Sequence, residues 1–288
     1  MTAFDVFVAR KTAAAETAAI DPFTTEFARG GTLTAIGNDW SRRMFDGAFY
    51  LSAAVRPDLP ATNLVFVRSR DGNTVASDPA TLGGGEADKH LVYEGLSRVA
   101  ADAVLGGAGT VRGGNIVLSV WKREIVELRA SLGLPRHPMQ IVATIGGLDL
   151  TRGLMFNTPE LRVIVITLRG GADAMQPALM ARPWISLVTM ERAGDLAWAF
   201  GRLRDLGVRR LSCIGGRTLA GELVDEGLVQ DLYLTTSARS AGQPGTPFYS
   251  KPLAAREIVR KKGTGADKGV EFQHLQIGAE PLRPARPA

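Results

Sequence analysis

The sequence contains one cysteine and few aromatic residues, and these shortages exclude several classes of protein. Cys213 alone cannot form an internal disulfide or a cysteine zinc cluster, and a chain without disulfides suits a reducing cytoplasm. Aromatic residues make up 7% of the chain, too few and too dispersed for a nucleic-acid stacking platform. No apolar run approaches the roughly 18 residues of a membrane span, and residues 1–5 lack the basic start of a secretory signal. We therefore expect a cytoplasmic protein with no nucleic-acid or membrane partner.

The charged residues show no strong bias and no metal-ligand spacing. The chain carries 34 lysines and arginines against 29 acids, a formal charge of +5. Most arginines are scattered, and several stand next to acids, as in Arg204-Asp205, which is typical of a solvated surface. Arginines next to glycine turns instead favour attraction of a polyanion. The histidines at 90, 137 and 274 are far apart in the sequence, so we expect no metal site.

Short apolar runs alternate with amphipathic segments from residue 63 onward. Strands are expected at 64–67, 102–105, 140–145, 161–168, 185–189, 209–214 and 230–236, and helices at 87–100, 121–132, 196–203 and 218–226. This alternation predicts an α/β fold with a mostly parallel sheet and helices on both faces. Segments 257–261 and 269–277 predict a C-terminal antiparallel hairpin, with a bulge near Gln273-His274. A closed eight-stranded barrel is the alternative, although a barrel should end on a helix.

The chain divides into three parts by composition. Residues 1–60 are expected to form an N-terminal extension that packs on the main domain at 61–280, and 281–288 should be a loose tail. Within the extension, a short helix is expected to begin at 13–19, and strands at 33–36 and 48–55.

Two glycine-bearing turns about a hundred residues apart are the most informative feature. One is Gly106-Gly107-Ala108-Gly109-Thr110-Val111, and the other is Gly215-Gly216-Arg217-Thr218-Leu219. Each follows a short apolar run, so each turn is expected to expose backbone N–H groups at the end of a strand and the start of a helix. The first turn is not a Rossmann fingerprint, since Arg112 replaces the third glycine. Thr218 could either cap its helix or face an anion, and Arg217 could pair with a phosphate.

At these motifs the chain resembles a known family. The second turn continues through Gly221, Leu223, Gly227-Leu228-Val229, Asp231-Leu232-Tyr233, Gly242 and Pro247-Phe248. Together with Asp102–Val111 and Ser69-Arg70-Asp71-Gly72, this order resembles the C-terminal reductase domain of the bifunctional riboflavin-biosynthesis deaminase-reductase. The resemblance implies a dihydrofolate-reductase-like fold, NADPH as cofactor, hydride transfer to a pyrimidine-ribose or pterin-like substrate, and a homodimer.

The resemblance also implies roles for particular residues. The cofactor-binding residues would be Gly107, Gly109, Thr110, Val111, Thr167, Arg169, Gly215, Gly216, Arg217, Thr218 and Leu219. Thr167 and Arg169 would end a central strand near the adenosine end, where Arg169 could select NADPH through its 2′-phosphate or be only a solvated turn residue. Asp71 would be the catalytic carboxyl that orients an amine or relays a proton, or it could simply cap a turn.

The substrate side departs from the family pattern. Ile214 stands where the family usually has a carboxylate, Arg112-Gly113-Gly114-Asn115 replaces an Asp-Asp-Pro segment, and Gly83-Gly84-Gly85-Glu86 replaces a Trp-Ile-Thr segment. The zinc-ligand pairs of a deaminase domain are also absent from the sequence. We therefore expect an NADPH-dependent reductase of uncertain substrate, or alternatively a catalytically silent NADPH-binding dimer that acts as a sensor or scaffold.

Overall fold

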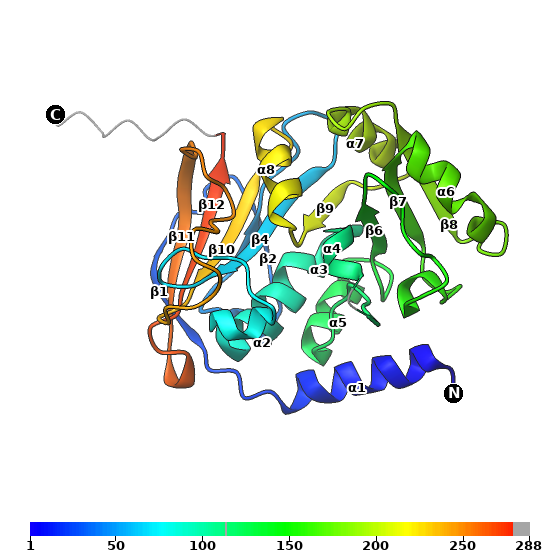
Figure 1. Ribbon diagram of the computed structural model, residues 1–288. Helices are drawn as coiled ribbons and strands as arrows, with labels where there is room; N and C mark the ends of the chain where they lie inside the picture. The colour runs from blue at the N-terminus through cyan, green and yellow to red at the C-terminus, as the bar shows by residue number, and fades with distance from the viewer. Residues whose placement is uncertain (113, 279–288) are drawn as a thin grey trace.

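The computed structural model describes residues 1–112 and 114–278, and a ten-stranded sheet runs through them (Figure 1). The expected tail at 281–288 lies outside the described residues. The strands are β1 (Phe23–Ala28), β2 (Thr34–Ile36), β3 (Phe49–Leu51), β4 (Ala61–Arg68), β5 (Ala103–Gly107), β6 (Met139–Ala143), β7 (Val163–Leu168), β8 (Ile185–Met190), β9 (Arg210–Cys213), β10 (Asp231–Thr236), β11 (Ala255–Gly263) and β12 (Glu271–Ile277). The α-helices are α1 (Ala3–Thr17), α2 (Asp39–Met44), α3 (Ser97–Val99), α4 (Ala108–Val111), α5 (Arg123–Ser131), α6 (Arg169–Leu179), α7 (Leu196–Asp205) and α8 (Arg217–Asp225). Short 3₁₀ turns are η1 (Pro79–Leu82), η3 (Leu154–Phe156) and η4 (Gly265–Asp267), and η2 (Ala87–Leu96) is a π-helix.

The order of the strands confirms the expected fold class. The large sheet runs β1-β11-β12-β10-β4-β9-β5-β6-β7-β8. Its strands are parallel from β10 to β8, and β12, β11 and β1 continue the sheet in antiparallel pairing. The sheet is open, with β1 and β8 as its edges, so the barrel alternative is wrong. Strands β2 and β3 form a separate two-stranded sheet.

Both faces of the sheet are covered, which explains the apolar runs in the sequence. Alternate residues of a strand point to opposite faces. In β7, Val163 and Val165 join one hydrophobic cluster while Ile164 and Ile166 join the other. The first cluster packs against η2, α5 and the N-terminal extension, and the second packs against α7 and α8 (Figure 1).

The N-terminal extension packs on the first of these faces. Helix α1 begins at Ala3, ten residues before the expected start, because Thr2 and Asp5 form a capping box. Phe7 on this helix lies 5.7 Å from the ring of Trp121. Strand β1, which the sequence did not reveal, pairs with β11 and so extends the large sheet.

The hairpin forms, but its irregularity lies on the other strand. The register shifts between Glu257 and Val259 of β11, and β12 pairs with β10 without a shift. The change of phase in β12 needs no bulge near Gln273-His274, because both faces of this strand are covered. Phe272 packs in the first cluster and Leu275 packs against the second.

Two kinds of feature are missing from the described residues. Within 1–112 and 114–278, no helix is long and apolar enough to cross a membrane. Over the same residues, no group of three or more His, Cys, Asp or Glu side chains could hold a metal ion.

Candidate active site

The two glycine turns lie side by side at the carboxyl ends of two parallel strands of the sheet. Strands β5 and β9 are parallel neighbours, with Leu105 opposite Cys213. The Gly107 amide donates a hydrogen bond to the Gly215 carbonyl oxygen at 3.1 Å, and the Ile214 amide donates to the Leu105 carbonyl oxygen at 2.9 Å. The two turns are therefore adjacent, where the parallel strands β5 and β9 end.

Two of the glycines lie where the turns approach each other, and geometry requires glycine at Gly215. Gly215 has φ +95°, and a Cβ atom there would lie 3.0 Å from Cζ of Phe66 on the neighbouring strand β4. A Cβ at Gly107 would point toward the other turn, 3.8 Å from the Gly215 carbonyl oxygen and 3.9 Å from the Gly216 backbone. Without side chains at these positions, the backbones of the two turns lie close together.

Helices start directly from both turns. Helix α4 follows Gly107 and α8 follows Gly216, and neither N-terminus has a side-chain cap. Thr218 does not cap α8, because Gly216 is the N-cap residue and Thr218 is the second residue of the helix. The first amides of both helices are therefore left for another acceptor, and those of α8 lie at the positive end of its helix dipole. This arrangement suits an anion between the turns.

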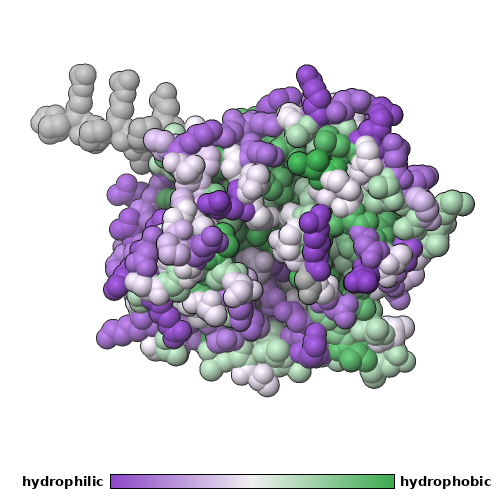
Figure 2. Space-filling view, in the orientation of Figure 1, coloured by the Kyte–Doolittle hydropathy of each residue, from purple (hydrophilic) through white to green (hydrophobic). Residues whose placement is uncertain are grey.

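The side chains of the turns divide into exposed and buried groups. Arg217 and Thr218 are exposed, and Arg217 forms no ion pair with the described residues. Thr110 and Leu219 are half-buried, and Leu219 packs against the second hydrophobic cluster. Val111 is 7% exposed and belongs to the core, so only its backbone faces the turn. Figure 2 shows a hollow near the middle of the face on which α4 and α8 are seen in Figure 1.

Ile214 is part of the core. It is 8% exposed, and its Cγ1 atom lies 3.6 Å from the Cβ position of Gly106. An apolar side chain thus fills the position where the family pattern has a carboxylate, so this turn supplies no acid to a substrate.

Thr167 and Arg169 also lie at the carboxyl end of a parallel strand, farther across the sheet. Strand β7 is not central: it is two strands from β5, roughly 10 Å away, and next to the edge strand β8. The Thr167 hydroxyl is buried and donates to the Ile145 carbonyl oxygen at 3.3 Å. Arg169 starts α6, a helix that the sequence did not reveal and that has no side-chain N-cap. Its guanidinium is exposed and pairs with Glu191 at 2.6 Å.

Asp71 lies in the turn that follows β4. Its carboxylate is exposed and accepts a hydrogen bond from the Ser240 hydroxyl at 3.0 Å, in the loop after β10. The Gly72 amide donates to the Ser69 carbonyl oxygen at 2.9 Å, which closes the turn. Strand β4 lies between β10 and β9, so Asp71 stands at the same edge as the Gly215 turn.

The sequence does not predict a role for a second carboxyl, Asp88, which also lies near the carboxyl ends of the parallel strands. It is 6% exposed and lies on the π-helix η2, and π-helical segments are frequent at functional sites. Its Oδ1 atom is buried without a hydrogen-bond partner among the described residues. Gly84 covers it, since a Cβ there would lie 2.8 Å from Asp88 Oδ2. The sequence does hold a signal: Asp88 stands three residues before Leu91, on the apolar face of the helix.

The surroundings of Asp88 raise the pKa of its carboxyl, so the group keeps its proton to a higher pH than an exposed aspartate does. Burial raises the pKa of Asp88 to about 7, with the nearby Thr235 hydroxyl lowering it and the negative Asp267 raising it further. Thr235 stands opposite Val67 near the ends of β10 and β4, which places Asp88 above the edge that carries the glycine turns. A buried carboxyl that titrates near neutral pH is a candidate functional group.

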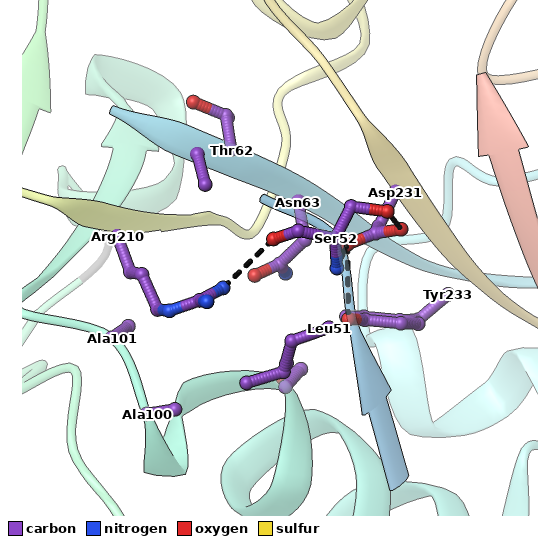
Figure 3. Close-up of a pocket in the computed structure, with 11 residues that line it drawn as sticks. Leu51, Ser52, Thr62, Asn63, Ala100, Ala101, Arg210, Asp231 and Tyr233 are labelled. Carbon is purple, nitrogen blue, oxygen red and sulfur yellow. Dashed lines mark hydrogen bonds between the residues drawn. The ribbon is translucent and has the colours of Figure 1, made fainter. Parts of the chain in front are cut away.

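A small cavity at the amino ends of the parallel strands has a different role (Figure 3). Its volume is about 10 Å³, which is room for one water molecule. Ser52 Oγ donates to Asp231 Oδ1 at 2.7 Å, and Arg210 donates to the Ser52 carbonyl oxygen at 2.9 Å. These contacts fix the end of the N-terminal extension to the first residues of β9 and β10. The cavity is too small for a dinucleotide.

Solved structures with the same fold were found by comparison. A pyrimidine reductase-like protein from Corynebacterium diphtheriae superimposes with a TM-score of 0.60 and 20% identity, over 77% of this chain and 93% of that one. RibD from Acinetobacter baumannii gives a TM-score of 0.59 and 17% identity, over 77% of this chain and 58% of that one. The riboflavin biosynthesis reductase Rib7 of Saccharomyces cerevisiae gives a TM-score of 0.51 and 17% identity, over 76% of this chain and 91% of that one. No curated protein sequence matches this chain.

The model of one protein family, the RibD C-terminal domain, matches residues 62–267. The chain belongs to this family. The expected family resemblance is thereby confirmed, the expected α/β fold class agrees with the sheet described above, and the family is one of reductases. The match covers both glycine turns, Asp71 and Asp88, and leaves the N-terminal extension outside it.

Proposed function

We propose that this protein is an NADPH-dependent reductase that transfers a hydride to a pyrimidine-ribose, pterin or related heterocyclic substrate. The hydrogen bond from Gly107 to Gly215 carries the proposal, because it holds two helix starts without side-chain caps next to each other. Paired helix starts of this kind suit a diphosphate, which needs backbone donors and close approach. Arg217, exposed beside it, adds a cation for a phosphate oxygen.

The residues that would hold the cofactor come from three strand ends. One wall is formed by Gly107, Gly109, Thr110 and the backbone of Val111, and the other by Gly215, Gly216, Arg217, Thr218 and Leu219. As the family resemblance implies, Arg169 would meet the adenosine end of an extended dinucleotide, and the buried Thr167 hydroxyl would support the end of β7 beside it. Arg169 would exchange its exposed contact with Glu191 for the 2′-phosphate. The bound nicotinamide supplies the hydride, and the protein positions the two rings and excludes water.

Two carboxyls could serve the substrate. Asp71 is exposed and held by Ser240, a position suited to orienting an amine of the substrate. Asp88 is buried with a pKa raised to about 7 by burial, so a substantial fraction carries a proton at neutral pH. A group in this range can donate a proton as the ring is reduced, once movement of Gly84 uncovers it. We assign the orienting role to Asp71 and proton donation to Asp88.

A second candidate function rests on Ile214. Because this side chain is buried in the core where the family pattern has a carboxylate, the protein could bind NADPH without turnover, as a sensor or scaffold. We further propose that in either case it acts in the cytoplasm as a homodimer, as the family resemblance implies.

Titration of the purified protein with NADPH and with NADH, followed by nicotinamide fluorescence, tests the proposal. Micromolar binding that favours NADPH is expected, and failure to bind either would contradict both functions. Stopped-flow oxidation of NADPH in the presence of a panel of pyrimidines and pterins then separates the two. Turnover with any of them supports the reductase, and binding with no turnover across the panel supports the silent dimer.

A further inference from the structure

The N-terminal extension reaches the edge of the sheet where the candidate active site lies. The family match begins at residue 62, so the extension is an addition to the family domain. Its strand β1 starts at Phe23, which pairs with Gly263 at the end of β11. Glu271, at the start of β12, pairs with Thr236 at the end of β10. The turn between β11 and β12 therefore stands beside the carboxyl end of β10.

Asp21 holds this turn in place. Its Oδ2 atom accepts a hydrogen bond from the Ala266 amide at 2.7 Å, and Thr264 Oγ1 donates to the Pro22 carbonyl oxygen at 2.5 Å. Gly265 has φ +53°, and a Cβ there would lie 2.2 Å from Asp21 Oδ2. The extension and the turn are thus fitted to one another at backbone distance.

In the same turn, Asp267 lies against the start of the π-helix η2. Asp267 is 7% exposed, and its Oδ2 atom accepts a hydrogen bond from the Ala87 amide at 3.1 Å. A Cβ at Gly85 would lie 1.8 Å from Asp267 Oδ1, so the glycine segment before η2 closes tightly over this carboxylate. Asp88, the buried carboxyl of the candidate site, is the next residue after Ala87.

We propose that the N-terminal extension is a working part of the active centre, and that Asp21 is a positioning residue for Asp88. Asp21 fixes the turn, the turn fixes Asp267, and Asp267 fixes the first residues of η2 with Gly84 over the Asp88 carboxyl. This inference rests on the proposed function for the use of Asp88 as an acid, while the contacts themselves need no cofactor.

The arrangement keeps a proton on Asp88 in two ways. It excludes water from the carboxyl, and it holds the negative Asp267 nearby. The other titratable neighbour is Tyr93 of η2, whose own pKa is raised, chiefly by burial, with Asp88 among the charges that add to the shift. Burial raises the pKa of Asp267, and the charges of Asp21 and Glu86 add to that shift. Release of the turn would admit water and remove a like charge, and both changes lower the pKa of Asp88.

NMR titration of the aspartate carboxyls, with Asp88 assigned through Asp88→Asn, tests the inference without a substrate. In Asp21→Ala, the pKa of Asp88 should fall by about one unit or more. Loss of the anchoring hydrogen bond should speed exchange of the Ala87 and Ala266 amides about tenfold. Asp21→Asn keeps an acceptor for Ala266 and should restore most of the protection of these amides. Asp58→Ala removes an exposed carboxylate from the same extension and should change nothing.

An unchanged Asp88 titration in a folded Asp21→Ala protein would overturn the inference. Asp267→Asn gives a second reading if Asp21→Ala does not fold, because it removes the like charge directly and should also lower the pKa of Asp88. An unchanged pKa in that variant would equally count against the inference. NADPH titration of the unaltered protein is a separate measurement, so failure of the proposed function is distinguished from failure of this coupling.

Discussion

The Gly107 amide and the Gly215 carbonyl oxygen lie 3.1 Å apart and join two turns that are separated by more than a hundred residues in the chain. This bond sets the spacing between the starts of α4 and α8. Under the proposed function, binding of a diphosphate would depend on that spacing, because backbone donors must converge on the same oxygen atoms.

Gly107→Val should weaken NADPH binding at least about tenfold, because the added methyl groups would lie against the Gly215-Gly216 backbone and displace backbone donors worth about 1–3 kcal/mol each. Gly107 has extended backbone angles that valine adopts easily, so the fold should be retained. Fluorescence titration measures the affinity and thermal melting checks the fold. Gly201→Val on α7, with open space around the Cβ position, is the matched control and should bind as the unaltered protein does. Equal affinity in the two variants would place the cofactor elsewhere.

Arg217→Ala should weaken NADPH binding by roughly 10-fold, the loss of one charge-assisted hydrogen bond of about 1.5–3 kcal/mol. The loss should shrink as salt is added, because the arginine is exposed. Titrations at low and high ionic strength measure both effects. Arg202→Ala, which breaks an exposed pair with Asp205, serves as the control. Unchanged affinity in Arg217→Ala removes this residue from the site.

Arg169 and Glu191 give a test of cofactor selectivity. Arg169→Ala should lower NADPH affinity by about tenfold and leave NADH affinity unchanged, because only NADPH carries the 2′-phosphate. Glu191→Ala should have the opposite effect on NADPH, since it frees the guanidinium from its 2.6 Å partner. Parallel titrations with both dinucleotides measure the ratio. If both variants keep the ratio of the unaltered protein, the 2′-phosphate is bound by other groups.

The raised pKa of Asp88 predicts a pH-dependent stability. Burial raises the pKa to about 7 from 3.8, so the folded state binds more protons than the unfolded state between these values. The free energy of unfolding should therefore decrease as pH rises from about 4 to about 7. At about 1.4 kcal/mol per unit of pKa, the penalty above pH 7 is on the order of a few kcal/mol.

Asp88→Asn should remove this dependence, and its advantage over the unaltered protein should be largest at pH 8 and vanish near pH 4. Urea denaturation at a series of pH values measures the difference. Asp173→Asn, an exposed change on α6, controls for the loss of one carboxylate. A constant difference between Asp88→Asn and the unaltered protein at all pH values would mean that Asp88 does not titrate as described.

The parts of the site formed from continuous segments were predictable from the sequence. Each glycine turn follows a recognisable strand, and strands in an alternating pattern end at a common edge. The start of α6 was not predictable, because Gly170 and Gly171 are poor helix formers and Pro177 lies inside the helix. The sequence therefore predicts that Arg169 ends a strand, whereas it is the first residue of helix α6.

The features that depend on distant contacts were not visible in the sequence. Strand β1 exists because it pairs with β11, more than two hundred residues later, and no local pattern records this pairing. The burial of Asp88 depends in the same way on Gly84, Thr235 and Asp267, from three separate segments. Its place on the apolar face of a helix is the only local sign, whereas Asp71 lies in a segment that matches the family motif.

Helices α4, α6 and α8 all begin without a side-chain cap at the edge where the dinucleotide is expected. A side-chain cap typically stabilises a helix by about 1 kcal/mol. Without a ligand, the first amides of these three helices lack that hydrogen bond and remain free for one. A bound dinucleotide would complete them from outside the chain. The free energy of unfolding would then rise with the concentration of the dinucleotide, and resistance to heat and proteolysis would rise with it.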